Sequence, residues 1–101
     1  LWLVIQHAPL EIQKKYLPLL EASVMEGESK ARYLAFLQDR ILMREDQKQI
    51  YGTQSLWDTT KKHNVIWPIL NPENVNQRRK AVGLEPIEAY AEANGFLYIQ
   101  D

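Results

Sequence analysis

A histidine and an acidic residue are the first candidates for chemistry in this sequence. His7 follows the apolar run Leu1–Ile5 and precedes Pro9, whereas His63 stands beside two lysines. Histidine is the side chain best suited to proton exchange near neutral pH. A lone histidine at the end of an element is also common as a packing or hydrogen-bonding residue. We therefore weigh two roles for His7: an acid/base catalyst oriented by Asp39, or a structural group.

A polar stretch in the middle of the chain is the second candidate. Residues 49–54 place the hydroxyls of Tyr51 and Thr53 and the amide of Gln54 in series around Gly52. Glycine in a strand often marks a bulge or the close approach of another group. The stretch is therefore either a ligand-contacting element or a hairpin strand whose glycine lets a helix or a tryptophan pack against it.

Several kinds of chemistry are excluded by what the sequence lacks. It has no cysteine, no glycine-rich phosphate loop, no paired-histidine metal signature and no nucleophile elbow. We therefore expect no metal and no cofactor. With 12 basic and 13 acidic residues the net charge is −1, which argues against a nucleic-acid partner. No apolar run approaches the ~20 residues that span a bilayer, so no membrane partner is predicted either.

Charge is segregated late in the chain. Residues 61–80 hold five basic residues and one acidic residue, and residues 81–101 hold four acidic residues and no basic one. These segments either neutralise each other across the fold or form a basic site for an anion. Surface charge runs are mostly solvated, which favours neutralisation.

Helices must position most of these side chains. Apolar spacing predicts four of them, over residues 10–26, 30–44, 72–82 and 86–94. The first has a stripe that includes Ile12 and Leu20. The second carries Leu37 in its main stripe and further apolar residues on its far side, which is typical of a central helix. Asn71 is the predicted N-cap of the third.

Two runs of strand-forming residues complete the predicted fold. Residues 49–54 and 65–69 are rich in Ile, Tyr, Thr, Val and Trp, and they predict a hairpin with a loop near 56–64. The predicted fold class is therefore mainly α. We expect four to five helices packed around the 30–44 helix, with a short β-hairpin around residues 49–69.

The length and the start of the chain bear on its organisation. A chain of 101 residues is expected to form a single domain, residues 1–101. The apolar run Leu1–Ile5 begins abruptly, so we expect a fragment that lacks its N-terminal segment. The compartment stays open, because any targeting signal would lie in that segment.

Asp39 needs a partner if the central helix buries it, because an unpaired buried charge costs several kcal/mol. Arg40 is adjacent on the helix and points about 100° away. We therefore predict an ion pair between Asp39 and Arg78 or Arg79, which would arrive from the 72–82 helix.

Several strings of the sequence are distinctive in combination. They are Gln6-His7-Ala8, residues 34–41 with Asp39-Arg40, residues 49–54, Pro68-Ile69, residues 71–75, Arg78-Arg79 and Gly83-Leu84. Together they resemble a bacterial family, domain of unknown function 6624. The resemblance implies a mostly helical domain with a small hairpin, and it supplies no activity. Family members usually carry a glycine-tryptophan-proline element upstream, which this chain lacks.

The leading functional hypothesis is a pocket for a small polar or anionic ligand. Together with His7 near its mouth, it would draw side chains from four separate segments. The lining residues are Asp39, Arg40, Tyr51, Thr53, Gln54 and Arg79.

Two alternatives come from other classes of protein. A metal-independent hydrolase or transferase would use His7 as acid/base, Asp39 as its orienter and Arg79 as a charge stabiliser. A protein-interaction module would instead display tryptophans as anchors, namely Trp2, Trp57 and Trp67. The expected partner is accordingly an unknown small polar ligand or a protein.

Overall fold

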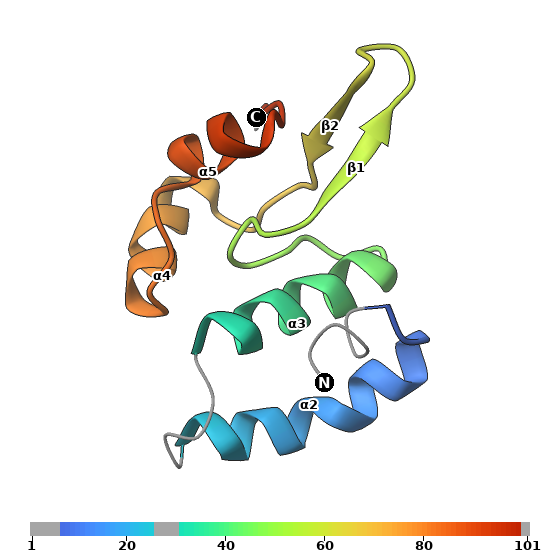
Figure 1. Ribbon diagram of the computed structural model, residues 1–101, viewed down its shortest axis with the longest axis vertical. Helices are drawn as coiled ribbons and strands as arrows, with labels where there is room; N and C mark the ends of the chain where they lie inside the picture. The colour runs from blue at the N-terminus through green and yellow to red at the C-terminus, as the bar shows by residue number, and fades with distance from the viewer. Residues whose placement is uncertain (1–6, 26–30, 100–101) are drawn as a thin grey trace.

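The computed structural model describes residues 7–25 and 31–99 of the chain (Figure 1). Its elements follow in the order α2 (Leu10–Met25), α3 (Ala31–Arg44), β1 (Ser55–Asp58), β2 (His63–Ile66), the 3-10 turn η1 (Pro72–Asn74), α4 (Val75–Ala81) and α5 (Ile87–Asn94). The predicted mainly α class with a short hairpin is confirmed. None of the described helices is long and apolar enough to cross a membrane.

The helices α2 and α3 form an antiparallel pair at one end of the molecule (Figure 1). Leu20 of α2 packs with Leu37 and Ile41 of α3 in an apolar core. Half-buried side chains surround it, namely Leu10, Tyr16, Leu17, Tyr33 and Leu34. The α3 helix lies between α2 and the rest of the chain, as predicted for the 30–44 helix (Figure 1).

The inward face of α2 differs from the predicted stripe. Ile12 is 46% exposed, whereas its neighbour Gln13 is fully buried. The helix contacts α3 through Leu10, Leu17 and Leu20, whose spacing of seven and three residues places Gln13 on the same face. At the start of α2 the buried face therefore includes Gln13, one residue further along the chain than the predicted Ile12.

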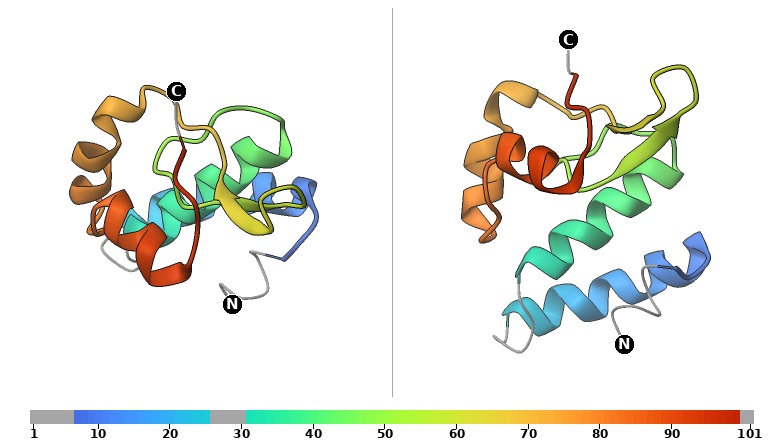
Figure 2. Two further views of the ribbon diagram at one scale, coloured as in Figure 1. Left: turned by 90° about the horizontal axis from the view of Figure 1, so that it is seen from above. Right: turned by 45° about the horizontal axis from the view of Figure 1, so that its top comes forward.

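The second half of the chain forms its own apolar core. Ile66 and Ile69 from the hairpin side pack against Val75 of α4 and Ile87 of α5. The two further views in Figure 2 show α4 and α5 side by side, with the hairpin projecting beyond them. The tail after α5 returns to the sheet, where Leu97 forms a parallel bridge with Val65.

The hairpin lies further along the chain than predicted for its first strand. Its strands pair Ser55 with Ile66 and Asp58 with His63. The predicted strand 49–54 is instead an irregular loop, with one isolated parallel bridge between Gln49 and Ile69. Side chains from distant helices occupy the backbone groups of this segment, so a neighbouring strand cannot pair with them.

Asn71 is not the predicted N-cap. Its backbone is left-handed, with φ of 47°, and its side chain makes no capping hydrogen bond. An N-cap needs an extended backbone so that its side-chain oxygen reaches the next N–H groups. The segment after it first forms η1, and α4 begins only at Val75. The predicted end of the last helix at Gly95 is confirmed, where φ is 69°.

Candidate functional site

Asp39 holds the segment Gln49–Gln54, here called the clamped loop, by its backbone. The Asp39 side chain is fully buried. Its carboxylate accepts the N–H groups of Ile50 at 2.8 Å, Tyr51 at 3.0 Å and Thr53 at 3.0 Å. The Thr53 hydroxyl is a fourth donor, at 2.9 Å. Burial raises the pKa of the Asp39 carboxyl above its ordinary value, and the hydrogen bonds from the loop oppose that rise.

Gln49 joins the two ends of the clamped loop. Its buried amide donates to the carbonyls of Gln54 at 3.0 Å and Trp67 at 2.7 Å. The amide oxygen of Gln49 accepts the N–H of Gln54 at 2.9 Å. All of these acceptors and donors are backbone groups, so a single glutamine does here what a partner strand does in a sheet.

Two arginines of α4 hold the carbonyl side of the same loop. Arg78 Nε donates to the carbonyl of Ile50 at 2.8 Å, and Arg79 Nη1 donates to that of Tyr51 at 2.7 Å. Arg79 is fully buried and also donates to the carbonyl of Glu85 at 2.6 Å. Burial lowers the pKa of the Arg79 guanidinium from its ordinary value.

The α5 helix supplies the last contacts. Tyr90 donates its hydroxyl to the carbonyl of Thr53 at 2.9 Å, and its ring lies 4.8 Å from the Arg79 guanidinium. Gly52 has a left-handed φ of 71°, and a Cβ at this position would overlap the Cδ1 atom of Ile87. The loop therefore follows one path between α3, α4 and α5, which only a glycine allows at residue 52.

The predicted ion pair of Asp39 with an arginine is wrong. No arginine in the described part of the chain forms an ion pair with Asp39; the ion pairs found there are Lys14–Glu45 and Lys61–Asp58. Tyr51 lies between the two charges instead, because it donates its N–H to Asp39 and accepts from Arg79 at its carbonyl. The charge of Asp39 still opposes, across this gap, the lowering of the Arg79 pKa that burial causes.

A chain of side-chain hydrogen bonds leads from Asp39 to Arg40. The Thr53 hydroxyl donates to Asp39, the Gln54 amide donates to the Thr53 hydroxyl at 3.0 Å, and Arg40 Nη1 donates to the Gln54 amide oxygen at 3.1 Å. Arg40 is half-buried, and its Nε has no hydrogen-bond acceptor among residues 7–25 and 31–99. Burial lowers the pKa of Arg40, and the charge of Arg44 lowers it further.

His7 lies at the end of α3 that carries Arg44. Its neighbour Ala8 accepts a hydrogen bond at its carbonyl from Arg44, which is one helical turn beyond Arg40. His7 is exposed. The hydrogen bonds to the Asp39 carboxylate come from the clamped loop, and the proposed pairing of His7 with Asp39 stays a prediction.

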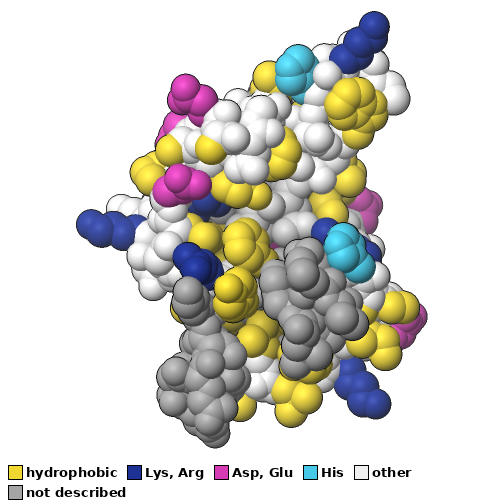
Figure 3. Space-filling view, in the orientation of Figure 1, with side chains coloured by type: hydrophobic (Ala, Val, Ile, Leu, Met, Phe, Trp, Pro, Cys, Tyr) yellow, Lys and Arg dark blue, Asp and Glu magenta, His cyan; other side chains and the backbone are white. Residues whose placement is uncertain are grey.

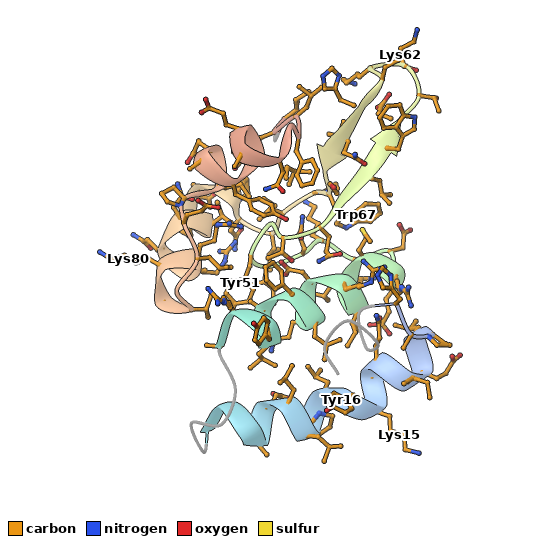
Figure 4. All side chains as sticks on the ribbon, in the orientation of Figure 1. Lys15, Tyr16, Tyr51, Lys62, Trp67 and Lys80 are labelled. Atoms are coloured by element: carbon orange, nitrogen blue, oxygen red, sulfur yellow. The ribbon has the colours of Figure 1, made fainter. Side chains whose placement is uncertain are left out.

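The structure thus gathers six of the seven predicted site residues around the clamped loop, on the α3, α4 and loop sides, namely Asp39, Arg40, Tyr51, Thr53, Gln54 and Arg79. Figure 4 shows the Tyr51 side chain over the middle of α3. It is half-buried, and burial together with the charge of Asp39 raises the pKa of its hydroxyl. Its hydroxyl donates to no described residue.

The two described cavities border the clamped loop only at Ile50. One is about 500 Å³ and the other about 330 Å³, and Leu42 and Ile50 line both. None of the predicted site residues lines either of them. No group of three or more His, Asp or Glu residues in the described ranges is arranged to hold a metal ion.

The tryptophans predicted as anchors differ in exposure. Trp57 on β1 is 60% exposed, beside the exposed Leu56. Basic side chains and a histidine stand at the far end of this hairpin in Figure 3. Trp67 is half-buried, and its indole N–H donates to the carbonyl of Gln47 at 2.7 Å. Trp2 lies outside the described residues.

Sequence reasoning assigned no site role to Gln49 and Tyr90, which hold the loop, and it named Arg78 only as an alternative ion-pair partner of Asp39. Their loop contacts in the structure reach across up to 37 residues of sequence. No local spacing rule reports such contacts. The one available signal was the polar content of the loop itself.

Comparison with known proteins gives a family and nothing more specific. No curated protein and no solved structure matches the chain significantly. A family model described as a family of unknown function matches residues 1–98, which include α2 to α5, the clamped loop and all seven predicted site residues. The chain therefore belongs to the family of unknown function DUF6624.

Proposed function

We propose that this domain binds a small anionic ligand beside the clamped loop, with Arg40 as the main positive contact. The observation that carries the proposal is the state of the Arg40 guanidinium. It is half-buried, yet its only protein partner in the described ranges is the neutral amide oxygen of Gln54. A partly desolvated cation without a carboxylate is costly, and a bound anion would compensate it.

The neighbourhood of Arg40 strengthens this argument. Arg44 lies four residues further on the same face of α3, and like charges at this spacing repel by a few tenths of a kcal/mol. Arg44 donates to a backbone carbonyl rather than to a carboxylate. Two arginines thus face one side of the helix end without a carboxylate partner among the described residues, whereas the exposed Lys14 and Lys61 are ion-paired. An anion that bridges both guanidinium groups would remove this repulsion.

The other predicted site residues divide into contacts and supports. We assign His7, at the rim near Arg44, as a contact, and Tyr51 as a residue of the loop that Arg40 reaches through Gln54. Asp39 and Arg79 are fully buried and hold the backbone of the clamped loop, so we assign them a supporting role. This use of the Asp39 oxygens favours a binding role over the alternative in which Asp39 orients His7 for catalysis.

Isothermal titration calorimetry with citrate and with inorganic phosphate at low ionic strength tests the proposal. We expect saturable binding of at least one probe to the unmodified chain, and binding at least tenfold weaker in Arg40→Gln. Lys80→Gln is the matched control, because it removes the same charge from an exposed residue of α4 that points away from the loop (Figure 4). It should bind as the unmodified chain does.

Two outcomes would contradict the proposal. One is the absence of saturable binding of either probe to the unmodified chain. The other is equal affinity in Arg40→Gln and the unmodified chain, which would assign any binding to general surface charge. Circular dichroism of Arg40→Gln establishes that the variant is folded before its affinity is compared.

A further inference from the structure

We infer that an anion bound at Arg40 loosens the clamped loop, so that the position of Tyr51 reports whether the site is occupied. This inference rests on the proposed function, and it adds a regulatory consequence to that site. The link is the chain of hydrogen bonds from Arg40 through Gln54 and Thr53 to Asp39.

The series of hydrogen bonds from Arg40 to Asp39 can have only one order of donors and acceptors. A guanidinium only donates, so Gln54 must turn its amide oxygen toward Arg40 and its NH2 group toward Thr53. The Thr53 hydroxyl accepts from that NH2 group and has one proton, which goes to Asp39. Hydrogen bonds in such a chain polarise and strengthen one another. The Asp39 carboxylate is therefore coupled to the state of a cation on the outside of the loop.

A bound anion competes for the first link. Arg40 Nη1 is 3.1 Å from the Gln54 oxygen, which is a neutral acceptor. A carboxylate or phosphate oxygen forms a charge-assisted bond with a guanidinium, which is roughly twice as strong as a bond to a neutral group. When the guanidinium turns to the anion, Gln54 loses its donor and its NH2 group donates less strongly to Thr53. The Thr53 hydroxyl then holds Asp39 more weakly.

The loosened hold acts on the backbone of the loop. Asp39 binds the Thr53 hydroxyl and the Thr53 N–H with one oxygen, at 2.9 and 3.0 Å. The same carboxylate holds the N–H of Tyr51. A change in its orientation therefore reaches Tyr51, whose side chain is half-buried. Ligand binding beside Gln54 is therefore expected to change the freedom of the Tyr51 hydroxyl.

Amide hydrogen exchange of the full chain, measured by NMR with and without saturating citrate, tests this coupling. The N–H groups of Tyr51 and Thr53 should exchange at least threefold faster with citrate, relative to the buried Ala91 in α5. Because the anion must displace Gln54, binding and displacement are reciprocal. Gln54→Ala should therefore bind citrate severalfold more tightly and show no acceleration. Gln77→Ala, an exposed glutamine of α4, is the matched control and should behave as the unmodified chain does.

The outcomes separate the two proposals. If citrate does not bind the unmodified chain, the proposed function fails. If citrate binds in an Arg40-dependent way but exchange at Tyr51 and Thr53 is unchanged or slower, the site stands and the coupling is refuted. Equal acceleration in Gln54→Ala, or weaker citrate binding by that variant, also refutes the coupling, because the signal would then not pass through Gln54.

Discussion

Replacing Asp39 by asparagine changes one of the two oxygens that hold the clamped loop while keeping the size of the side chain. With the amide oxygen in the place of Oδ1, the bonds from the N–H groups of Ile50 and Tyr51 persist. The NH2 group then takes the place of Oδ2 and faces the N–H of Thr53, so two donors oppose each other. In the flipped orientation the NH2 group would face the N–H groups of both Ile50 and Tyr51, so two backbone donors would lose their acceptor.

The size of the effect follows from these contacts. One buried N–H without an acceptor costs roughly 1–3 kcal/mol, and each remaining bond loses part of the strength that a charged acceptor gives it. The loss of a buried charge offsets a part of this cost, because burial disfavours the ionised carboxylate. We expect Asp39→Asn to lower the free energy of unfolding by about 2–3 kcal/mol at neutral pH.

Urea unfolding followed by tryptophan fluorescence measures this loss. Asp46→Asn is the matched control, because it makes the same chemical change at an exposed residue with φ of 61°, a conformation that asparagine also adopts. It should change stability by less than about 0.5 kcal/mol. If Asp39→Asn were no less stable than this control, the carboxylate would not hold the loop, and the role assigned to it here would be refuted.

Further predictions concern the glycine of the loop, the helical core and the effect of pH. Gly52→Ala should cost about 2–4 kcal/mol because it combines a left-handed backbone with overlap against Ile87, whereas Gly83→Ala, with φ of 79° and open space around its Cβ, should cost only about 1–2 kcal/mol in the same urea assay. Leu37→Ala should cost about 2–5 kcal/mol, since Leu37 is fully buried, and a loss below about 1 kcal/mol would place it outside the core. Because burial raises the pKa of Asp39, the folded state binds a proton at this residue more strongly than the unfolded state does. This contribution to stability is complete below the ordinary pKa of 3.8, and it is lost as pH rises through the folded-state pKa. The stability difference between the unmodified chain and Asp39→Asn should therefore be larger at pH 3.5 than at pH 7, and the opposite trend would contradict the raised pKa.

The helices were predictable because their signals are local. Apolar spacing gave α3 and α5 to within a residue of their ends, and Gly95 marked where α5 stops. The burial of Leu37 followed from the same spacing. The rotation of the α2 face was not predictable, because Ile12 and Gln13 both fit a helix and only the position of α3 decides which one is covered.

The clamped loop was predicted as a strand for a physical reason. Ile50, Tyr51 and Thr53 favour extended backbone in a sheet, and strand propensity counts them without knowing what occupies their N–H and C=O groups. In the structure those groups bind Asp39 and Arg79. The sequence did indicate that polar residues would converge here. It did not indicate how Asp39 and Arg79 are connected, because a pattern of charges cannot distinguish a direct ion pair from two hydrogen bonds to the backbone of Tyr51.

The position of the clamped loop has a consequence for how the chain unfolds. The α2–α3 pair and the α4–α5 half each have their own apolar core, and the loop lies between them. The two cores are thus joined by a polar layer whose strength depends on geometry more than on buried area. Cooperativity, in addition to stability, then depends on this layer. A chain in which Asp39 and Arg79 are both truncated is expected to open in two steps, with the amides of α4 and α5 exchanging from a partly unfolded form in which α2 and α3 stay paired.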